Sequence, residues 1–300
     1  MDELDFFFIK RLFKNSRLTY RELAEMSNLS VSAVHKRIKR LEDEGIIKTY
    51  VARPSLISLK SLWVMIFGIS KGRSMDLISK ELGNHENVNF VGIAGRKSLS
   101  VSTFLRDLSE LQELGNFVSK TAQISEPFIG IKSLPYIATS ESLTTIDYKI
   151  LKTLNKDARK SITDIADDVG LSSKTVRKRL DRMIENDLAT FTIQWKPLHT
   201  TSFLVVFDIT LNGGNDLKSI IQHINQKYSR NIVNSYSYTN IPNRITMETW
   251  ARTAQEAHSI KKSLQTEGFK DILAHIGLSS DYYDCWIDQL LRTKSIKILN

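Results

Sequence analysis

Residues 29–47 read LSVSAVHKRIKRLEDEGII, and residues 171–189 read LSSKTVRKRLDRMIENDLA. Each stretch starts with a serine that can cap a helix, followed by apolar residues at positions i, i+4 and i+7. This spacing predicts a helix that buries one face and exposes the opposite face. The apolar stripes are Val34, Ile38 and Leu41 in the first stretch, and Val176, Leu180 and Met183 in the second.

The two stretches belong to an internal repeat with an offset of 142 residues. The register holds without a gap for nearly forty residues, which two unrelated amphipathic helices do not achieve. We therefore interpret the chain as a duplication. The matches include Asp5 with Asp147, Leu12 with Leu154, Arg17 with Arg159, Ala24 with Ala166, Val34 with Val176, and Lys36-Arg37 with Lys178-Arg179.

Two shorter helices are expected before each of these stretches. Thr19 stands three residues before Glu22, and Ser161 stands three residues before Asp164, a spacing typical of a helix start. After the third helix, residues 45–52 and 188–195 alternate in the manner of strands. Three helices followed by a strand predict a winged helix-turn-helix in each copy.

Basic and small residues occupy the exposed face of both third helices, taking about 100° per residue. Lysine and arginine neutralise phosphates, and small residues near the helix start allow a close approach to base edges in the major groove. One such face is more often merely solvated, but its duplication favours DNA. The predicted DNA-binding residues are Ser32, Ala33, Lys36, Lys39 and Arg40 in the first copy, and Lys174, Thr175, Arg177, Lys178 and Arg182 in the second.

Three charged residues of these helices have separate interpretations. Arg37 and Arg179 lie nearer the core side, where pairing with a local carboxylate and contact with a phosphate are both open. Asp181 stands where Lys39 stands in the first copy and would repel phosphate. We therefore expect the two copies to bind DNA unequally.

The composition agrees with a globular protein that binds a polyanion. The chain has 300 residues, 41% of them hydrophobic, with 5 prolines and a formal net charge of +9. One cysteine, Cys285, excludes an intrachain disulfide framework, and the six scattered histidines suggest no metal site. Apolar runs at 62–69 and 203–209 are shorter than the roughly 18 residues of a membrane helix. We expect no metal, no cofactor, no membrane contact and a cytoplasmic location.

The residues Asp5, Leu12, Arg17, Leu29-Ser30 and the run from Val34 to Ile47 resemble the Lrp/AsnC family of bacterial and archaeal regulators. The resemblance covers both copies and implies an α+β fold, with two winged helix-turn-helix domains each followed by a ferredoxin-like βαββαβ sensor domain of the RAM type. It implies winged helices at 1–54 and 144–197, sensor domains at 59–135 and 200–280, a linker at 136–143, and a C-terminal helix and tail at 281–300.

The sequence pattern is compatible with this sensor order in both copies. In the first we expect strands at 62–70, 89–93, 99–104 and 122–131, and helices at 75–82 and 107–118. In the second we expect strands at 203–211, 232–238, 244–250 and 271–278, helices at 217–227 and 254–265, and an added helix at 281–292.

Sensors of this family that hold an amino acid typically have Gly-x-x-Asp at the turn between the middle strands. The first copy has Gly95, Arg96, Lys97 and Ser98 there, with serine in place of the acid, and residues 239–243 of the second copy read TNIPN. Without the carboxylate, the turn lacks the acidic group that would bind the ammonium of an amino acid. Arg96 and Lys97 leave two interpretations, an anion-binding effector turn or an exposed basic turn, and the second is favoured.

The predicted function is a sequence-specific regulator that binds double-stranded DNA as a single-chain pseudo-dimer, with no enzymatic activity. Its small-molecule effector and any further self-association of pseudo-dimers stay open. Two alternatives remain: an architectural protein that coats DNA, and a tetrapyrrole enzyme similar to the siroheme decarboxylases, whose chemistry uses histidine and arginine around the middle strands. Of those side chains the second copy keeps Arg244.

Overall fold

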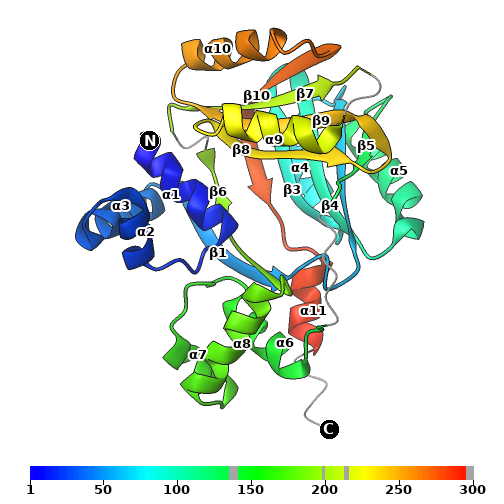
Figure 1. The fold of residues 1–300 in the computed structure, drawn as a ribbon. Coiled ribbons are helices and arrows are strands. Elements are labelled where there is room, and N and C mark those ends of the chain that lie inside the picture. Colours follow the sequence, from blue (N-terminus) through cyan, green and yellow to red (C-terminus); the bar gives the residue numbers. More distant parts are fainter. Residues whose placement is uncertain (135–140, 198–199, 213–215, 295–300) are drawn as a thin grey trace. The chain divides into compact units, whose positions relative to one another are not determined.

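A computed structural model describes residues 1–134, 141–197, 200–212 and 216–294. Its elements belong to two compact units, coloured along the chain in Figure 1. The helix-turn-helix unit comprises residues 4–61, 141–196 and 284–294, and the sheet unit comprises 1–3, 62–134 and 197–283 without the gaps. Residues 136–140 of the predicted linker and the predicted tail at 295–300 lie outside the described residues.

The helix-turn-helix unit contains the two predicted three-helix repeats. The first consists of α1 (Glu3–Lys14), α2 (Tyr20–Ser27), α3 (Val31–Asp43) and β1 (Ile47–Pro54), and the second of α6 (Thr145–Leu154), α7 (Ile162–Val169), α8 (Ser173–Glu185) and β6 (Ala189–Trp195). The predicted caps are confirmed, because Thr19 and Glu22 form a capping box and Ser161 Oγ accepts from the Asp164 amide. The predicted stripes are also confirmed, since all six of their residues are at most 2% exposed.

The strand that follows each third helix pairs with the other repeat. β1 and β6 form a two-stranded antiparallel sheet in which Tyr50 lies opposite Ile193 and Ala52 opposite Phe191. The sequence predicts a strand in each copy, but the local pattern does not reveal this partner. The pairing joins the two helix-turn-helix repeats through backbone hydrogen bonds.

The last helix, α11 (Trp286–Lys294), contacts α6 and β1 within this unit. Arg53 donates from Nε and Nη2 to the two carboxylate oxygens of Asp288, both at 2.8 Å, and Asp288 is 1% exposed. Asn155 Nδ2 donates to the same carboxylate at 2.8 Å. The C-terminal helix is therefore fixed to both repeats by one buried carboxylate.

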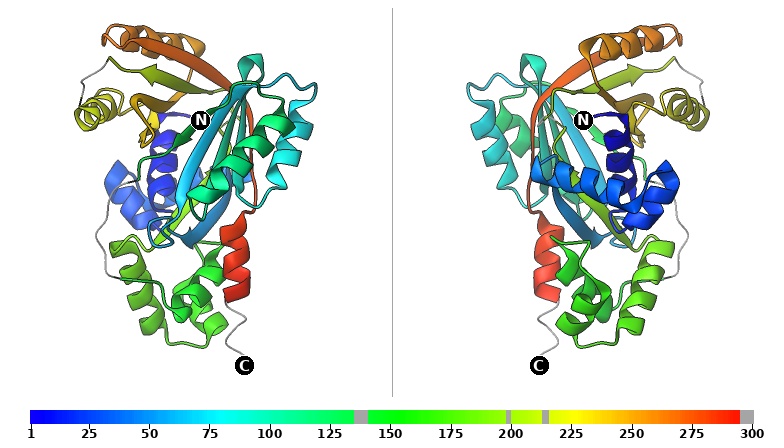
Figure 2. Two further views of the ribbon diagram at one scale, coloured as in Figure 1. Left: turned by 90° about the vertical axis from the view of Figure 1, so that its right-hand side faces the viewer. Right: turned by 90° about the vertical axis from the view of Figure 1, so that its left-hand side faces the viewer.

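The sheet unit contains one eight-stranded antiparallel sheet in the order β5-β2-β4-β3-β10-β7-β9-β8. Helices α4 and α5 cover the half formed by the first repeat, as Figure 2 shows, and α9 and α10 pack on the other half. The elements are β2 (Leu62–Ile69), α4 (Met75–Gly83), β3 (Val88–Ala94), η1 (Gly95–Lys97), β4 (Ser98–Leu105), η2 (Leu108–Glu110), α5 (Leu111–Ala122), β5 (Phe128–Ile131), β7 (Phe203–Thr210), α9 (Leu217–Lys227), β8 (Ile232–Tyr238), β9 (Ile241–Ala251), α10 (Ala254–Gln265) and β10 (Asp271–Tyr282).

Both halves of the sheet have the same internal strand order, fourth-first-third-second, as the predicted βαββαβ arrangement requires. The second strand of each repeat lies beside the fourth strand of the other. β3 pairs with β10, and β8 meets the end of β5 through a bridge between Tyr238 and Lys132. The first junction is an extended strand pair, and the second is an isolated bridge between the ends of the two edge strands.

Several element boundaries differ from those expected from the sequence, including the start of β9, which lies at Ile241 and not at residue 244. The strand expected at 122–131 is shorter, because α5 continues to Ala122 and β5 spans only Phe128–Ile131. Helix α5 also begins later than residue 107, since Asp107 Oδ1 accepts from the Ser109 amide and caps η2 instead. β10 runs on to Tyr282 because its second half pairs with β3, which delays the last helix to Trp286.

No helix among the described residues is long and apolar enough to cross a membrane.

Candidate nucleic-acid interface

The outward face of α3 carries the basic residues predicted from its helical spacing. Ser32, Lys36 and Lys39 are exposed, while Val34 and Ile38 on the opposite face are fully buried. Lys36 makes no ion pair with any described residue. Lys39 pairs with Asp43 at 2.9 Å, and this carboxylate raises the pKa of the lysine. Lys36 is thus the side chain of this face most available to a phosphate.

The outward face of α8 is more basic near its start. Lys174, Arg177 and Lys178 are exposed, and none of them forms an ion pair with a described residue. Asp181 is exposed on the same helix, at the position equivalent to Lys39. The two helices therefore present positive charge in different patterns.

The small polar residues at the helix starts are held by the capping serines. Ser30 Oγ accepts from the Ala33 amide at 3.2 Å and lies 3.1 Å from Ser32 Oγ. In the second repeat, Ser172 Oγ accepts from the Thr175 amide at 3.1 Å and lies 2.9 Å from Thr175 Oγ1. The hydroxyls of Ser32 and Thr175 are therefore held in place by the protein itself. Such fixed groups are suited to hydrogen bonds with base edges.

Four arginines on the flanks of these helices pair with a buried aspartate on the first helix of their own repeat. In the first repeat, Arg37 Nη1 lies 2.9 Å from Asp5 Oδ1, and Arg40 Nη2 lies 2.5 Å from Asp5 Oδ2. The second repeat has the same arrangement, with Arg179 at 3.1 Å and Arg182 at 2.5 Å from Asp147.

These aspartates are at most 1% exposed, so the pairs connect the first helix to the third. Of the two interpretations of Arg37 and Arg179, the structure shows the pairing with a local carboxylate. Arg40 and Arg182, which the sequence places in the DNA-binding set, are engaged in the same way. The sequence analysis did not predict that Asp5 and Asp147 pair with these arginines. The match of the two aspartates in the repeat could have indicated a shared structural role.

The turn between the first two helices contains a reciprocal contact that sequence reasoning missed. Arg17 Nη1 donates to the carbonyls of Ala158 and Lys160 at 2.7 and 3.3 Å. Arg159 Nη1 donates to those of Ser16 and Leu18 at 3.0 and 2.9 Å.

Every partner in one repeat corresponds to the partner in the other at the same offset of 142 residues. Burial and the neighbouring Arg159 lower the pKa of Arg17. Contacts in which i touches j and j touches i define a twofold interface. The two helix-turn-helix repeats therefore form a pseudo-twofold pair within one chain.

Comparisons with known proteins agree with this arrangement. A family model described as winged helix-turn-helix DNA-binding matches residues 1–48, and the AsnC-type helix-turn-helix domain matches residues 143–184. An uncharacterized HTH-type transcriptional regulator of Pyrococcus furiosus is 32% identical over 123 residues, which are 40% of this chain and 83% of the relative. The chain belongs to the Lrp/AsnC family.

Other members and one solved structure extend the comparison. The HTH-type transcriptional regulator LrpA of Mycobacterium tuberculosis is 28% identical over 127 residues, or 41% of this chain and 85% of that protein. The crystal structure of the siroheme decarboxylase NirDL aligns over 100% of both chains with a TM-score of 0.60 and 10% identity. At this identity the likeness shows the fold alone, including its tandem organisation.

In this Lrp/AsnC chain, the turn predicted as an effector site is exposed and strongly curved. Arg96 and Lys97 have φ angles of 58° and 57°, in the left-handed region, and both are exposed. Lys97 Nζ donates to the Gly72 carbonyl at 2.9 Å, and a side chain at Gly95 would meet no atom within 4 Å. Gly95 and Ser98 thus border an open turn in which neither cation forms an ion pair with a described residue, and Arg96 also makes no side-chain hydrogen bond with one.

The equivalent turn of the second repeat, at residues 239–243, is hydrogen-bonded to the neighbouring strand β5. Asn240 Oδ1 accepts from the Ile131 amide at 2.8 Å, and Asn240 Nδ2 donates to the Ile129 carbonyl at 2.9 Å. The Asn240 side chain thereby hydrogen-bonds the backbone of β5 as a neighbouring strand would. This explains why the second turn has neither the glycine nor the acid of the family signature.

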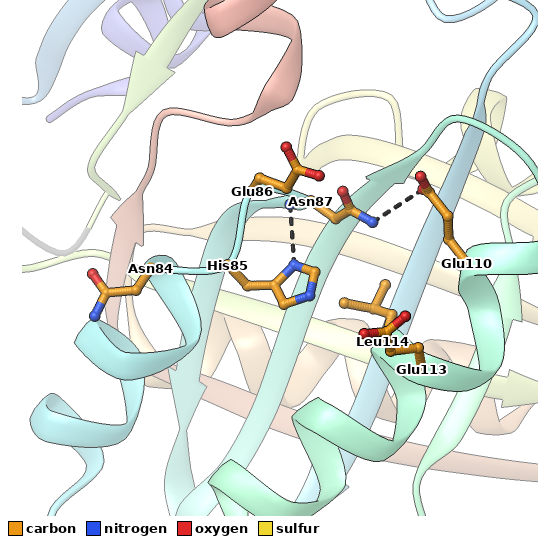
Figure 3. A pocket seen from close by; sticks show the side chains of 7 residues that line it. All are labelled: Asn84, His85, Glu86, Asn87, Glu110, Glu113 and Leu114. Carbon is orange, nitrogen blue, oxygen red and sulfur yellow. Dashed lines mark hydrogen bonds between the residues drawn. The ribbon is translucent and has the colours of Figure 1, made fainter.

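A surface hollow of about 410 Å³ lies beside the start of β3, lined by Asn84, His85, Glu86, Asn87, Glu110, Glu113 and Leu114 (Figure 3). Several of its polar groups are hydrogen-bonded, while Asn87 Oδ1 is buried without a hydrogen-bond partner among the described residues. Asn87 Nδ2 donates to Glu110 at 3.1 Å, the Asn87 amide donates to His85 Nδ1 at 3.2 Å, and Arg106 donates to both oxygens of Glu86. Among the described residues, no group of three or more His, Cys, Asp or Glu could hold a metal ion.

Proposed function

We propose that this protein is a sequence-specific transcriptional regulator that binds double-stranded DNA as a single-chain pseudo-dimer. The observation that carries the proposal is the reciprocal contact of Arg17 and Arg159, which relates two basic third helices by a local twofold. A twofold protein matches an inverted repeat in DNA, with half-sites about one helical turn or a multiple apart.

The two half-sites should differ in strength. Lys36 and Lys39 lie on the outward face of α3, whereas α8 combines Lys174, Arg177 and Lys178 with Asp181. Opposite charges at the equivalent positions 39 and 181 give the helices different phosphate contacts. We therefore propose an imperfect inverted repeat as the operator.

Control by an effector, if it uses the middle turns, would act through the first repeat. Arg96 is exposed there, whereas the second turn is occupied by the Asn240 hydrogen bonds to β5. The basic residues would favour an anion over an ammonium group. An exposed basic turn without a ligand is the simpler alternative.

The fold shared with NirDL favours one second candidate, a tetrapyrrole enzyme. The arginine that such chemistry would use is already engaged, because Arg244 Nη2 donates to Asp208 at 2.8 Å and its guanidinium carbon lies 3.9 Å from the Phe128 ring centroid. We therefore place the regulator ahead of the enzyme. Absorbance of the purified protein in the porphyrin range would identify a bound tetrapyrrole.

The test of the proposal is selection of bound duplexes from a random pool at physiological salt, followed by titration of the enriched duplex against a scrambled one. A regulator should enrich one site and prefer it by at least about a thousandfold. Tight binding without enrichment would support a DNA-coating protein. Absence of binding to any duplex would contradict both DNA-binding functions.

A further inference from the structure

Beside the bridge between the ends of β5 and β8, one lysine lies between two aromatic rings. Lys132 follows β5, is 9% exposed, and has its Nζ 3.6 Å from the Trp63 ring centroid and 4.1 Å from that of Tyr236. Its backbone is fixed, because the Lys132 amide donates to the Trp63 carbonyl at 2.8 Å and the residue bridges to Tyr238. Trp63 belongs to the first repeat and Tyr236 to the second, so the arrangement requires both.

The Lys132 ammonium has three donors and makes no hydrogen bond or ion pair with any described residue. Glu248 on β9 is the opposite charge that acts on it, but its Oε1 accepts from Tyr236 Oη at 3.3 Å. Attraction to the ring faces compensates the buried charge in part. Nζ is not among the buried side-chain atoms of the described residues that lack a hydrogen-bond partner, so it keeps access to solvent and its donors are available to an acceptor on a ligand.

The electrostatics of the site follow from its burial. Burial lowers the pKa of Lys132 to about 8, while Glu248 opposes this shift. Burial raises the pKa of Glu248 and of Tyr236, the two titratable groups on neighbouring strands that face the lysine. An anion bound to Nζ would stabilise the ammonium form.

The surroundings of the ammonium are apolar. Met65, Tyr236 and Tyr238 form a buried cluster, and Trp63, Phe67, Phe128 and Ile241 pack against it while remaining partly exposed. We propose that Lys132 binds a small carboxylate with a flat apolar group, the carboxylate accepting from Nζ and the apolar group packing on these aromatic side chains. This site goes beyond the proposed function and does not rest on DNA binding.

The experiment is calorimetric titration of the full chain, without DNA, with benzoate as the probe between pH 6 and pH 10. Because the ammonium form is present below the pKa of Lys132, the affinity should be constant below about pH 8 and fall by up to about tenfold per pH unit above it. An ordinary exposed lysine would place this decline above about pH 10.

Two lysine variants form a matched pair. Lys132→Met keeps a side chain of similar length to the aliphatic part of lysine and removes the ammonium group. It should weaken benzoate binding by at least about tenfold. Lys80→Met removes an exposed lysine from α4 of the same unit, outside the basic turn, and should leave the affinity and its pH profile unchanged. Thermal unfolding of both variants shows whether the fold is retained.

Glu248→Gln keeps the proposal falsifiable if Lys132→Met does not fold. Since Glu248 favours the ammonium form and repels a carboxylate, its removal should tighten binding at pH 6 and move the decline below pH 8. A decline that disappears in Glu248→Gln would assign the titration to Glu248 and overturn the proposal. The same conclusion follows if the native chain does not bind millimolar benzoate, or if Lys132→Met binds it equally well.

Discussion

The two third helices, α3 and α8, share a scaffold and differ in the surface that faces outward. Each is capped by a serine, carries an apolar stripe and pairs two arginines with a buried aspartate on the first helix. In contrast, Lys39 in α3 corresponds to Asp181 in α8, and His35 corresponds to Arg177. The His35 ring packs edge-on against the Tyr20 ring, with 5.0 Å between the ring centroids. The second repeat has Ile162 in place of Tyr20 and lacks this contact. The two repeats therefore share their caps, apolar stripes and aspartate pairs, and differ in the residues of the outward faces.

The largest expected effect concerns the shared scaffold. Asp147→Ala removes the buried partner of Arg179 and Arg182 and also the capping box with Thr144, and should lower the free energy of unfolding by about 3 kcal/mol, although Arg182 keeps the exposed Glu141. Asp5→Ala should cost less, because Arg40 is 47% exposed while Arg182 is 26% exposed, and water can solvate the freed guanidinium. Urea unfolding measures both. The exposed Asp181→Ala is the control and should stay within about 0.5 kcal/mol of the native chain; equal losses for all three would contradict the comparison.

The next effect concerns the charge that both surfaces have in common. The double change Lys36→Ala and Lys178→Ala should weaken binding to every duplex, on the order of tenfold or more. It should also reduce the slope of log affinity against log salt by about two, because two counterions fewer are released. Titrations at several salt concentrations give this slope. Lys97→Ala is the matched control, and an unchanged slope in the double variant would place the DNA contacts elsewhere.

A smaller effect concerns the charge by which the surfaces differ. Asp181→Lys makes α8 equivalent to α3 at this position and should steepen the salt slope by about one. The reverse change, Lys39→Asp, should make the slope shallower by a similar amount. If both variants bind like the native chain, positions 39 and 181 do not face phosphate.

The smallest effect concerns sequence preference. Ser32→Ala and Thr175→Ala remove hydroxyls that are already positioned by the capping serines. Each should change the preferred base pair in one half-site with less than about tenfold loss of affinity for the best duplex. Repeating the duplex selection with each variant measures this, and a preference that changes in both half-sites or in neither would refute direct readout by these residues.

Local sequence patterns predicted most of this fold because the deciding contacts are close in the chain. The capping residues Thr19 and Ser161, the stripe from Val34 to Leu41 and the order of sensor elements are of this kind. Contacts between the repeats were not predicted. The pairing of β1 with β6, the extension of β10 along β3 and the Lys132 site join residues more than 100 positions apart, and no local pattern reports such a partner.

The same limit applied to the candidate interface. Helical spacing placed Lys36, Lys174 and Lys178 on the exposed faces, where the structure has them. It could not show that Arg40 and Arg182 turn toward Asp5 and Asp147, because those aspartates lie about 35 residues earlier on another helix. The matched spacing of Asp5 with Arg40 and of Asp147 with Arg182 is the signal that would have found the pairs.

The most direct test of the single-chain pseudo-dimer is the stoichiometry of the complex with a duplex that carries both selected half-sites. Analytical ultracentrifugation with labelled duplex at concentrations above the dissociation constant measures it. The account predicts one chain per duplex, and the same ratio with weaker binding when one half-site is scrambled. Two chains on the intact duplex, falling to one when a half-site is scrambled, would contradict it, because each half-site would then be read by a separate molecule.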